Sequence, residues 1–580
     1  MIKKKTRGVN INWGLLSGDE AVARGAYENG VAVAASYPGT PATEIAESLS
    51  LFSEVDCQWS VNEKVAYEVA YSAAVGGLRA LFSAKHVGLN VAMDALMTSA
   101  YTGVNAGFVA VSADDPGMHS SQNEQDNRLM ARMAGIPVLE PGSPADAKEM
   151  AGAAFGISEK FDIPVILRLT TRVAHSKENV RLGARLRVRP RAFVPDIPKY
   201  VMVPGNARKR HIDLLRRLSL LKAFSEQSAF NRIERGKSSL GIVASGVSYL
   251  YAREMFPDAS FLKLGLVYPF PAEKASRFAA SVKEVLVIEE LEPFLEDEMR
   301  KAGIKCRGKA YSFRHGELRP EYMPLLLKGE ERPDGKTIGR SPVMCAGCPH
   351  RQVFWLLKKM KLTVAGDIGC YSLGASPPLS SLHTCVCMGS SLTFLEGLRK
   401  STGRDTVAVI GDSTFVHSGI TGLINMGYNR SPGTVLILDN GTTAMTGNQP
   451  HPGTGITLQS GPGKKLSLEA LCLACGADNV DVIDPYDIVG LERLLLLRIE
   501  EEKLSVIIVR SACLLLKKER GAPVFIDAGR CSGCLLCLGA GCPALKKGIE
   551  GKIRVDVSLC NGCGLCVSIC RMSAIRKQEK

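Results

Sequence analysis

Short apolar runs alternate with longer amphipathic stretches over most of the chain. Each run has the length of a buried strand, and the stretch between two runs is long enough for a helix. The clearest runs are residues 31–36, 106–113, 163–169, 241–246, 261–266, 284–290, 406–412, 434–440 and 504–511. Strands that alternate with helices favour parallel sheets, so the pattern predicts an α/β fold with three parallel-sheet domains.

Changes in composition divide the chain into five parts. Three α/β domains are expected at residues 1–180, 238–335 and 336–520. A linker, residues 181–237, separates the first two, and a small cysteine-rich domain, residues 521–580, follows the third. The linker begins with residues 181–217, which hold eleven Lys and Arg against two acids and contain four prolines. Proline and a run of like charge are typical of a segment between domains, here one that crosses acidic surfaces.

The overall composition is that of an ordinary globular protein, with 46% hydrophobic and 22% charged residues. The net charge of +14 would suit a nucleic-acid partner, but much of the excess lies in the linker, and metal-bound thiolates in the tail would cancel part of it. We therefore expect no nucleic-acid partner.

The chain shows no pattern of export or membrane insertion. Its basic first residues lack the apolar run of a signal peptide, and the apolar-looking segment 89–113 is interrupted by Asn90, Asp94 and Asn105. We expect no membrane span and a cytoplasmic location, in a reducing and anaerobic cell that would preserve iron–sulfur clusters.

Eight of the eighteen cysteines lie in the last fifty residues, in two near-copies of one motif. The first three cysteines of each copy follow C-x2-C-x2-C, so that one tight loop can supply three thiolates to an iron–sulfur cube. In two-cluster bacterial ferredoxins the fourth thiolate comes from the other copy. The motif therefore predicts that residues 521–580 form a two-cluster ferredoxin-like domain. One [4Fe-4S] cluster would be bound by Cys531, Cys534, Cys537 and Cys570 and the other by Cys560, Cys563, Cys566 and Cys542.

A tail held by disulfides or zinc is the alternative. Disulfides suit secreted chains, and a zinc ion needs four ligands rather than eight in crossed pairs. Two departures concern the geometry around Cys542 more than the existence of the clusters: four residues, Leu538 to Gly541, precede it where three are usual, and Arg571 replaces the proline expected after Cys570.

Two strand ends in the third block place oxygen ligands at one sheet edge. One strand-like run ends in Gly411-Asp412 and a later one in Asn440. Because parallel strands end at the same edge, Asp412, Asn440 and the backbone carbonyl of Thr442 suit an octahedral Mg2+ that also binds diphosphate. A helix expected to start at Ser418 would direct free N–H groups at the phosphates. Two ordinary turns are the alternative.

The stretch from Gly411 to Asn440, GDS to DN, resembles the thiamine diphosphate motif, with Ser413 and Asp439 as departures from the usual GDG and NN. Further stretches and the cysteine tail match one family in order over nearly the whole chain, namely residues 36–44, 84–94, 112–128, 343–352 and 367–374. The sequence resembles the alpha subunits of indolepyruvate ferredoxin oxidoreductases, within the thiamine diphosphate-dependent 2-oxoacid:ferredoxin oxidoreductase superfamily.

The resemblance implies a function for each α/β domain. Residues 1–180 would form a domain of the thiamine pyrimidine-binding type, residues 238–335 a transketolase C-terminal-like domain, and residues 336–520 the thiamine diphosphate and Mg2+ domain.

The resemblance also implies residue roles in the first domain. Thiamine enzymes use a glutamate, hydrogen-bonded to the aminopyrimidine, to promote loss of the C2 proton, and Glu63 matches that position. Glu68 is the alternative, although a solvated helix face also explains it. Thr40 matches the place where the superfamily presents a hydroxyl to the carboxylate of the oxoacid. His86 and His119 lie in family-like loops, but a lone histidine is more often structural.

The same comparison implies a third cluster. In related oxidoreductases a cluster near thiamine is held by a CxxC, a Cys after GIG and a distant Cys after a late strand, and the matching residues here are Cys345, Cys348, Cys370 and Cys513. Buried packing cysteines are the alternative. Iron counting distinguishes the two interpretations: about eight iron atoms per chain would reject the third cluster, and about twelve would support it.

The activity implied is oxidative decarboxylation of aryl 2-oxoacids, indolepyruvate first, with coenzyme A to aryl-acetyl-CoA and CO2, while ferredoxin is reduced. A smaller beta subunit is the expected partner. The same chemistry on pyruvate, 2-oxoglutarate or a branched-chain acid stays open, as does a non-catalytic electron-transfer subunit. The cysteine tail disfavours a non-oxidative decarboxylase.

Overall fold

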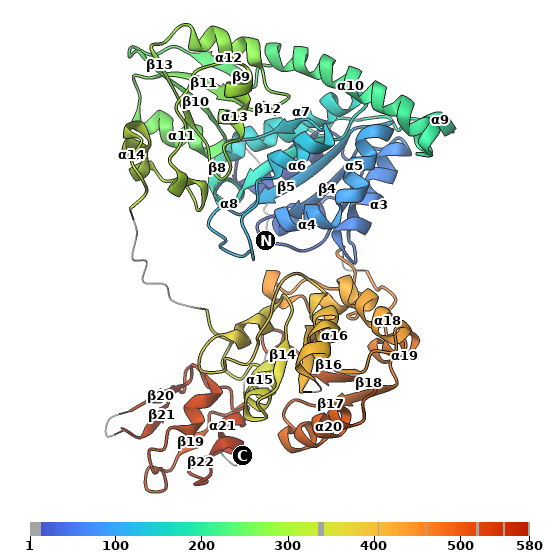
Figure 1. Ribbon diagram of the computed structural model, residues 1–580, viewed down its shortest axis with the longest axis vertical. Coiled ribbons are helices and arrows are strands. Elements are labelled where there is room, and N and C mark those ends of the chain that lie inside the picture. The colour runs from blue at the N-terminus through green and yellow to red at the C-terminus, as the bar shows by residue number, and fades with distance from the viewer. Residues whose placement is uncertain are drawn as a thin grey trace, which may run out of the picture. The chain divides into compact units, whose positions relative to one another are not determined.

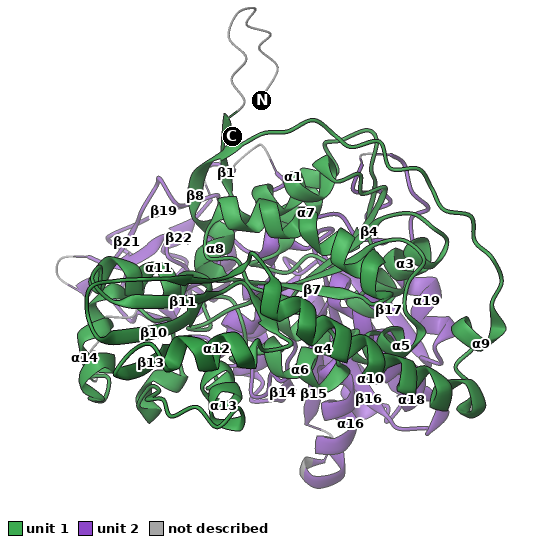
Figure 2. Ribbon diagram, turned by 90° about the horizontal axis from the view of Figure 1, so that it is seen from above, with its two compact units in different colours: residues 1–335 green, residues 336–580 purple. Residues whose placement is uncertain are grey.

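The computed structural model describes residues 13–333, 342–403, 405–459, 461–517, 521–548 and 551–577. The chain divides into two compact units, residues 1–335 and residues 336–580, coloured green and purple in Figure 2. Unit 1 holds the first two α/β domains, and unit 2 holds the third together with the cysteine-rich tail (Figure 1). The fold class expected from the hydrophobic pattern is therefore confirmed.

The first domain is built on a seven-stranded sheet in the order β12-β6-β7-β5-β4-β2-β3. Its strands are β2 (Val33–Ser36), β3 (Asp56–Trp59), β4 (Ala80–Lys85), β5 (Phe108–Asp114), β6 (Val138–Leu139), β7 (Val165–Thr170) and β12 (Leu266–Tyr268). Neighbouring strands are parallel except for β12 and β6. Every residue of β5 and β7 is buried, as expected of strands covered on both faces.

Helices cover this sheet, and a short antiparallel ladder flanks it. The helices are α1 (Gly18–Glu28), α2 (Thr43–Leu49), α3 (Glu63–Val75), α4 (His86–Val91), α5 (Met93–Thr102), α6 (Asn127–Ala134), α7 (Pro144–Phe161) and α8 (Thr171–His175). The ladder pairs β1 (Trp13–Ser17) with β8 (Lys177–Arg181).

The second domain has a four-stranded sheet in the order β13-β10-β11-β9, in which only β9 runs antiparallel to its neighbour. Its strands are β9 (Asn231–Glu234), β10 (Leu240–Ser245), β11 (Ser260–Leu264) and β13 (Glu284–Ile288), and its helices are α11 (Gly246–Met255), α12 (Ala272–Ala279), α13 (Phe294–Lys301) and α14 (Met323–Lys328).

The prediction of one continuous strand at residues 261–266 is wrong, because two strands lie there. The chain breaks at Gly265, so that β11 joins the second sheet while β12 joins the first. The backbone N–H of Gly265 donates to Oδ1 of Asn231 (3.0 Å), and a Cβ atom at this position would lie 2.5 Å from Cε of Met150. Close packing at the break thus favours glycine, and the second domain contributes a strand to the first.

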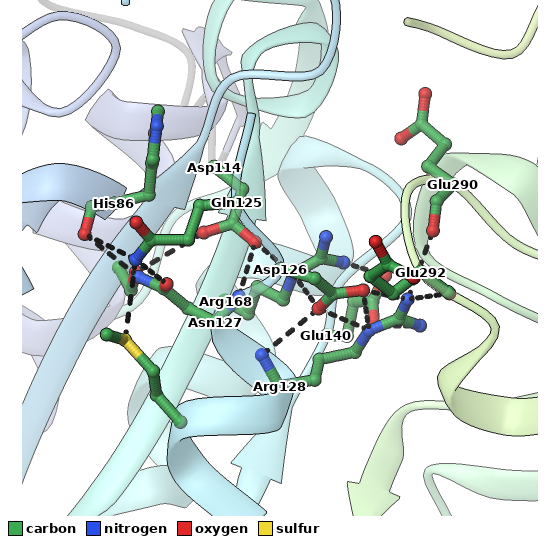
Figure 3. Close-up of polar contacts among 12 residues, drawn as sticks. His86, Asp114, Gln125, Asp126, Asn127, Arg128, Glu140, Arg168, Glu290 and Glu292 are labelled. Atoms are coloured by element: carbon green, nitrogen blue, oxygen red, sulfur yellow. Dashed lines mark hydrogen bonds and ion pairs between the residues drawn. The ribbon is translucent and has the colours of Figure 1, made fainter. Parts of the chain in front are cut away.

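A buried network of ion pairs also connects the two domains of unit 1 (Figure 3). Arg168 of β7 donates to Oδ2 of Asp114 and to Oε1 of Glu140, both at 2.7 Å. Arg128 of α6 pairs with Asp126 at 2.6 Å and reaches Oε2 of Glu289, just after β13, at 2.9 Å. Buried charges are tolerated where they are paired and hydrogen-bonded, so this network favours one fixed arrangement of both domains.

The basic linker is partly helical, with α9 (Ile197–Tyr200) and the long α10 (Pro204–Gln227), which contacts helices of both domains (Figure 1). Its charges meet acidic residues at the end of α7. Lys199 and Arg210 pair with the Asp162 carboxylate at 2.9 and 3.1 Å, and Arg191 pairs with Glu159 at 3.1 Å. These ion pairs neutralise part of the positive charge of the linker, so this part of the charge does not point to a phosphate ligand.

The third domain has a fully parallel five-stranded sheet in the order β14-β15-β16-β18-β17. The strands are β14 (Thr363–Ala365), β15 (Thr406–Gly411), β16 (Gly433–Asp439), β17 (Asn479–Ile483) and β18 (Leu504–Arg510). The helices are α15 (His350–Lys359), α16 (Ser390–Thr402), α17 (Asp412–Thr414), α18 (Ile420–Tyr428), α19 (Leu468–Ala474) and α20 (Ile488–Glu500). Side chains of α15 and α20 form one hydrophobic core with β15, β16 and β18.

The tail forms two short antiparallel ladders and one short helix. The ladders pair β19 (Phe525–Ile526) with β22 (Ile575–Arg576) and β20 (Leu545–Lys547) with β21 (Ile553–Val555), and the helix is α21 (Leu565–Ile569). Ala540, Leu565 and Ile569 pack against Trp355 of α15 and Ile488 of α20. The tail is therefore docked on the third domain. In the part of the chain that the structure describes, no helix has the length and apolar sequence that a membrane crossing requires.

Candidate cofactor and electron-transfer sites

Asp412 and Asn440 lie at the carboxyl ends of the neighbouring strands β15 and β16 and are 2% and 8% exposed. Oδ2 of Asp412 accepts a hydrogen bond from the N–H of Gly441 at 2.9 Å, which ties the first strand end to the turn after the second. Oδ1 of Asn440 accepts from the N–H of Thr442 at 3.1 Å. The structure thus brings together the residues that the sequence suggested as ligands.

The helix after β15 begins at Asp412, so the expected helix start at Ser418 is wrong. Gly411 is the N-cap residue, and α17 continues through one π-helical turn, Phe415–Gly419, into α18. Gly411 packs closely on Tyr371, so that a Cβ atom at this position would lie 2.6 Å from the Tyr371 ring. The first N–H groups of the helix therefore lie beside Asp412, whose Oδ1 accepts from the N–H of Ser413 at 2.9 Å. The Ser418 hydroxyl contacts Nδ1 of His417 at 2.6 Å.

Two carboxyl groups, those of Asp412 and Asp439, lie close to each other beside Asn440. Arg510 pairs with Oδ2 of Asp439 at 2.6 Å. Burial raises the pKa of Asp439, and Arg510 opposes this effect while the neighbouring Asp412 adds to it. Carboxylate and amide oxygens at one sheet edge are the donors that Mg2+ prefers. Among the described residues, no three His, Cys, Asp or Glu side chains are placed to bind a single metal ion, so a cation at this sheet edge would also need amide and carbonyl oxygens.

Glu63 is the first residue of α3 and is 4% exposed, whereas Glu68 lies on the solvent side of the same helix and pairs with Lys64. Asn62 caps the helix through the N–H of Val65 (2.9 Å). A helix N-terminus favours a carboxylate. The Glu63 carboxylate packs against α4 so tightly that a Cβ atom on Gly88 would lie 2.6 Å from its Oε1.

Thr40 lies half-buried in the loop after β2, next to a lysine that the sequence did not single out. Its carbonyl accepts from the hydroxyl of Ser120 at 3.0 Å, and the Ser120 carbonyl accepts from Nζ of Lys85 at 2.8 Å. Burial lowers the pKa of Lys85, and the carboxylates of Asp115 and Glu63 oppose this shift. Thr40, Lys85 and Glu63 thus gather at the carboxyl edge of the first sheet.

Both candidate histidines of the first domain, His86 and His119, have structural contacts. Nε2 of His86 lies 3.1 Å from the carbonyl and from Oδ1 of Asn123. The His86 carbonyl accepts from Nδ2 of Asn127 at 3.2 Å (Figure 3). His119 is half-exposed and pairs with Glu317 at 3.3 Å. Both side chains fix loops near the sheet edge.

The tail cysteines that the crossed pairing groups together lie near one another. Burial raises the pKa of the Cys537 thiol, and the thiols of Cys570, Cys534 and Cys531 raise it further. Burial likewise raises the pKa of Cys566 to about 12, with further contributions from Cys563, Cys542 and Cys560. A cavity in the tail is lined by all four cysteines of the second group, Cys542, Cys560, Cys563 and Cys566. Four thiols around one cavity are the donor set that a [4Fe-4S] cluster uses.

The four remaining candidates also lie near one another. Burial raises the pKa of Cys370 to about 11, and the thiols of Cys513 and Cys345 contribute to the rise. Burial raises the pKa of Cys348 to about 12, and Cys345 and Cys370 add to it. The structure therefore gathers a CxxC loop, the turn after β14 and the segment after β18 around a common position.

Three segments of the chain match known family models. Residues 24–202 match the model "Pyruvate flavodoxin/ferredoxin oxidoreductase, thiamine diP-bdg", residues 367–509 match "Thiamine pyrophosphate enzyme, C-terminal TPP binding domain", and residues 523–571 match "4Fe-4S dicluster domain". The indolepyruvate oxidoreductase subunit IorA of Methanothermobacter thermautotrophicus is 39% identical over 561 residues, which cover 90% of each chain. The chain belongs to the IorA family.

Other relatives support the same placement. The IorA subunit of Pyrococcus horikoshii is 38% identical and matches 91% of this chain and 90% of its own. The 2-oxoglutarate synthase subunit KorA of Archaeoglobus fulgidus is 26% identical and matches 54% of this chain and 99% of its own. As an IorA-family member, the chain is an enzyme of the 2-oxoacid oxidoreductase class that uses thiamine diphosphate and 4Fe-4S clusters.

Two buried histidines of this IorA-family chain were missed by the sequence reasoning. Nε2 of His451 lies 3.2 Å from Oδ2 of Asp412, and its Nδ1 accepts from the N–H of Gly453, which leaves the proton on Nε2. Burial lowers the pKa of His350 to about 4, with Asp412 opposing, and among the described residues neither ring nitrogen has a hydrogen-bond partner. Each histidine stands alone in the sequence, so no spacing marked it.

Proposed function

We propose that the chain catalyses oxidative decarboxylation of aryl 2-oxoacids, with indolepyruvate as the first candidate. Coenzyme A would take up the acyl group to form an aryl-acetyl-CoA, CO2 would leave, and two electrons would pass to ferredoxin. The observation that carries this proposal is 39% identity over 90% of the chain to a protein named as an indolepyruvate oxidoreductase subunit. A smaller beta subunit is the proposed partner, since that relative is a subunit by name.

We assign the cofactor ligands at the edge of the third sheet. Asp412 and Asn440, with the carbonyl of Thr442, would hold Mg2+ and through it the diphosphate, beside the backbone of Gly411 and near Ser418. Support comes from the hydrogen bond between Asp412 and Gly441, because a cation bound by both strand ends needs them close together. Thiamine diphosphate, when bound, supplies the electron sink for loss of CO2.

We assign proton control to Glu63, which would hydrogen-bond the aminopyrimidine ring. Its burial at a helix start supports this choice over the exposed Glu68. Thr40 would contact the carboxylate of the oxoacid through its hydroxyl. The nearby Lys85 offers a positive charge to the same anion.

We assign electron exit to the cysteines. The tail clusters would be bound by the two groups of four thiols, and the cavity lined by Cys542, Cys560, Cys563 and Cys566 supports the crossed pairing. A third cluster would be bound by Cys345, Cys348, Cys370 and Cys513, whose thiols lie near one another. About twelve irons per purified chain are expected, and about eight would exclude the third cluster.

The test of this function is a substrate panel. The chain, coexpressed with its beta subunit, is supplied with coenzyme A, thiamine diphosphate and Mg2+, and reduction of a redox dye is followed with different oxoacids. Faster reduction with indolepyruvate and phenylpyruvate than with 2-oxoglutarate or pyruvate is expected. A preference for 2-oxoglutarate would instead assign the substrate named for the KorA relative. If thiamine diphosphate binds but none of the oxoacids supports dye reduction, a non-catalytic electron-transfer subunit would be favoured.

A further inference from the structure

Arg351, the second residue of α15, is a buried cation between the CxxC loop and the tail. Its side chain is 2% exposed. Nη1 donates to the carbonyl of Ala540 in the tail at 3.0 Å, and Nη2 donates to the carbonyl of Cys345 at 3.0 Å and also to that of Met344. One guanidinium therefore connects the CxxC loop of the third domain to the residues just before Cys542.

The same guanidinium lines the cavity of the second group of tail cysteines. That cavity is bounded by Cys542, Cys560, Cys563 and Cys566 and, from outside the tail, by Arg351 and the loop residues Ala346 and Gly347. A Cβ atom on Gly541 would lie 3.2 Å from Nη1 of Arg351, so the chain approaches the guanidinium closely. After burial, which lowers the pKa of Arg351, the strongest influences on it are the thiols of Cys542 and Cys348, which raise it.

Two further contacts fix the loop that forms this wall. Nδ2 of Asn561 donates to the carbonyl of Ala346, and the hydroxyl of Tyr486 donates to that of Gly347, both at 3.0 Å. Gly347 has a φ of +72°, and a Cβ atom there would lie 2.0 Å from Oδ1 of Asn561. The CxxC loop is thus held directly against the second group of cysteines.

We propose that Arg351 is a positioning residue that raises the reduction potential of the cluster bound by Cys542, Cys560, Cys563 and Cys566. This inference rests on the proposed electron-exit function. Reduction adds one electron and therefore one negative charge to a cluster with four thiolates, and a fixed positive charge at the cavity wall stabilises the reduced form more than the oxidised form. The charge is buried and therefore weakly screened. The electron comes from the oxidation of the 2-oxoacid in the proposed reaction.

The chain offers a matched control for the position of the charge. Lys577 lies near the same cavity, because a Cβ atom on Gly564 would meet its side chain at 2.5 Å, but Lys577 is exposed to solvent. Water and salt screen an exposed charge, so removal of this cation is expected to change the potential far less. Comparison of variants at Arg351 and Lys577 therefore distinguishes the effect of a buried charge on the reduction potential from that of a solvent-exposed charge near the same cavity.

The test is a potentiometric titration of the purified holoenzyme, in which electron paramagnetic resonance monitors the reduction of the clusters. Iron is counted in each variant. Arg351→Gln keeps N–H donors but removes the charge, and Arg351→Lys keeps the charge. In Arg351→Gln at least one reduction wave should move to a more negative potential, with about a tenfold loss in the equilibrium constant for reduction, or 59 mV for one electron, while at least one wave stays. Arg351→Lys and Lys577→Gln should keep the wild-type values.

Unchanged waves in Arg351→Gln with full iron content, or an equal shift of all waves, would overturn the proposal. If Arg351→Gln loses iron, Arg351→Lys decides alone: with full iron, a wild-type potential supports the role of charge and a lowered potential overturns it. A wild-type chain with clearly fewer than about eight irons would instead refute the tail clusters themselves, so failure of this inference and failure of the proposed electron exit can be told apart.

Discussion

Replacement of Glu290 by glutamine should make unit 1 less sensitive to pH. Glu290 follows β13, is 5% exposed, and accepts a hydrogen bond from the N–H of Leu318 at 3.1 Å. Burial raises its pKa from the ordinary 4.5 to about 7; Arg168 and the Leu318 N–H oppose the rise, and Glu317 and Glu140 add to it. Between pH 4.5 and 7 the folded chain therefore holds a proton that the unfolded chain has released.

The sign and size of the effect follow from this difference in bound protons. Because the folded state binds more protons than the unfolded state, stability falls as pH rises through the window. With about 1.4 kcal/mol for each pKa unit, the free energy of unfolding of this region in the wild type falls by about 2.5 kcal/mol between pH 5 and pH 8. Glu290→Gln cannot lose a proton, and its amide oxygen can still accept from Leu318, so this loss should be absent.

Hydrogen exchange of peptides from β13 is the suitable assay, because a chain of several domains does not unfold in one step, whereas exchange reports local opening. After correction for the intrinsic pH dependence of exchange, wild-type protection should fall about 70-fold more than that of Glu290→Gln between pH 5 and pH 8. Glu292→Gln is the control, since Glu292 is about half exposed and pairs with Arg314 at 3.2 Å. An equal fall in wild type and Glu290→Gln would refute the reasoning.

Three further predictions concern the proposed cofactor sites. Glu63→Gln should retain thiamine diphosphate but lower turnover about 10²- to 10⁴-fold, because the amide cannot assist proton removal; C2 proton exchange at the wild-type rate would contradict this, and Glu68→Gln should behave as wild type. Asp412→Ala should weaken cofactor binding by at least about tenfold, measured by calorimetry, and saturating cofactor should restore part of the rate; unchanged affinity with lost chemistry would count against the assignment. Cys542→Ser should lose about four irons per chain, and a full iron count would exclude this cysteine as a ligand.

The strands of the α/β domains could be predicted because each is specified locally. Runs such as residues 106–113 and 434–440 are apolar throughout, and the structure has β5 and β16 there. The approach of Asp412 to the turn after Asn440 followed from the same reasoning, because parallel strands deliver their ends to one edge. The helix start at Ser418 could not be predicted, since nothing in the local pattern shows that β15 leads directly into a helix.

Contacts between segments distant in sequence escaped prediction. The sequence treated residues 238–335 as a separate domain, but β12 crosses into the first sheet and Arg128 reaches Glu289. The tail was likewise expected as an independent module, whereas Arg351 and Trp355 of α15 pack against it. Such docking depends on how surfaces meet in three dimensions, and a lone arginine or histidine carries no periodic signal of its partner.

The most direct test of the central claim is the electron yield of a single reaction. The chain, its beta subunit, coenzyme A and indolepyruvate are mixed with excess ferredoxin, and CO2 and reduced ferredoxin are measured together. We expect two reduced ferredoxins for each CO2, a reaction that requires thiamine diphosphate. Release of CO2 with aldehyde and no reduced ferredoxin would contradict an oxidative function and the role of the cysteine tail as the electron exit.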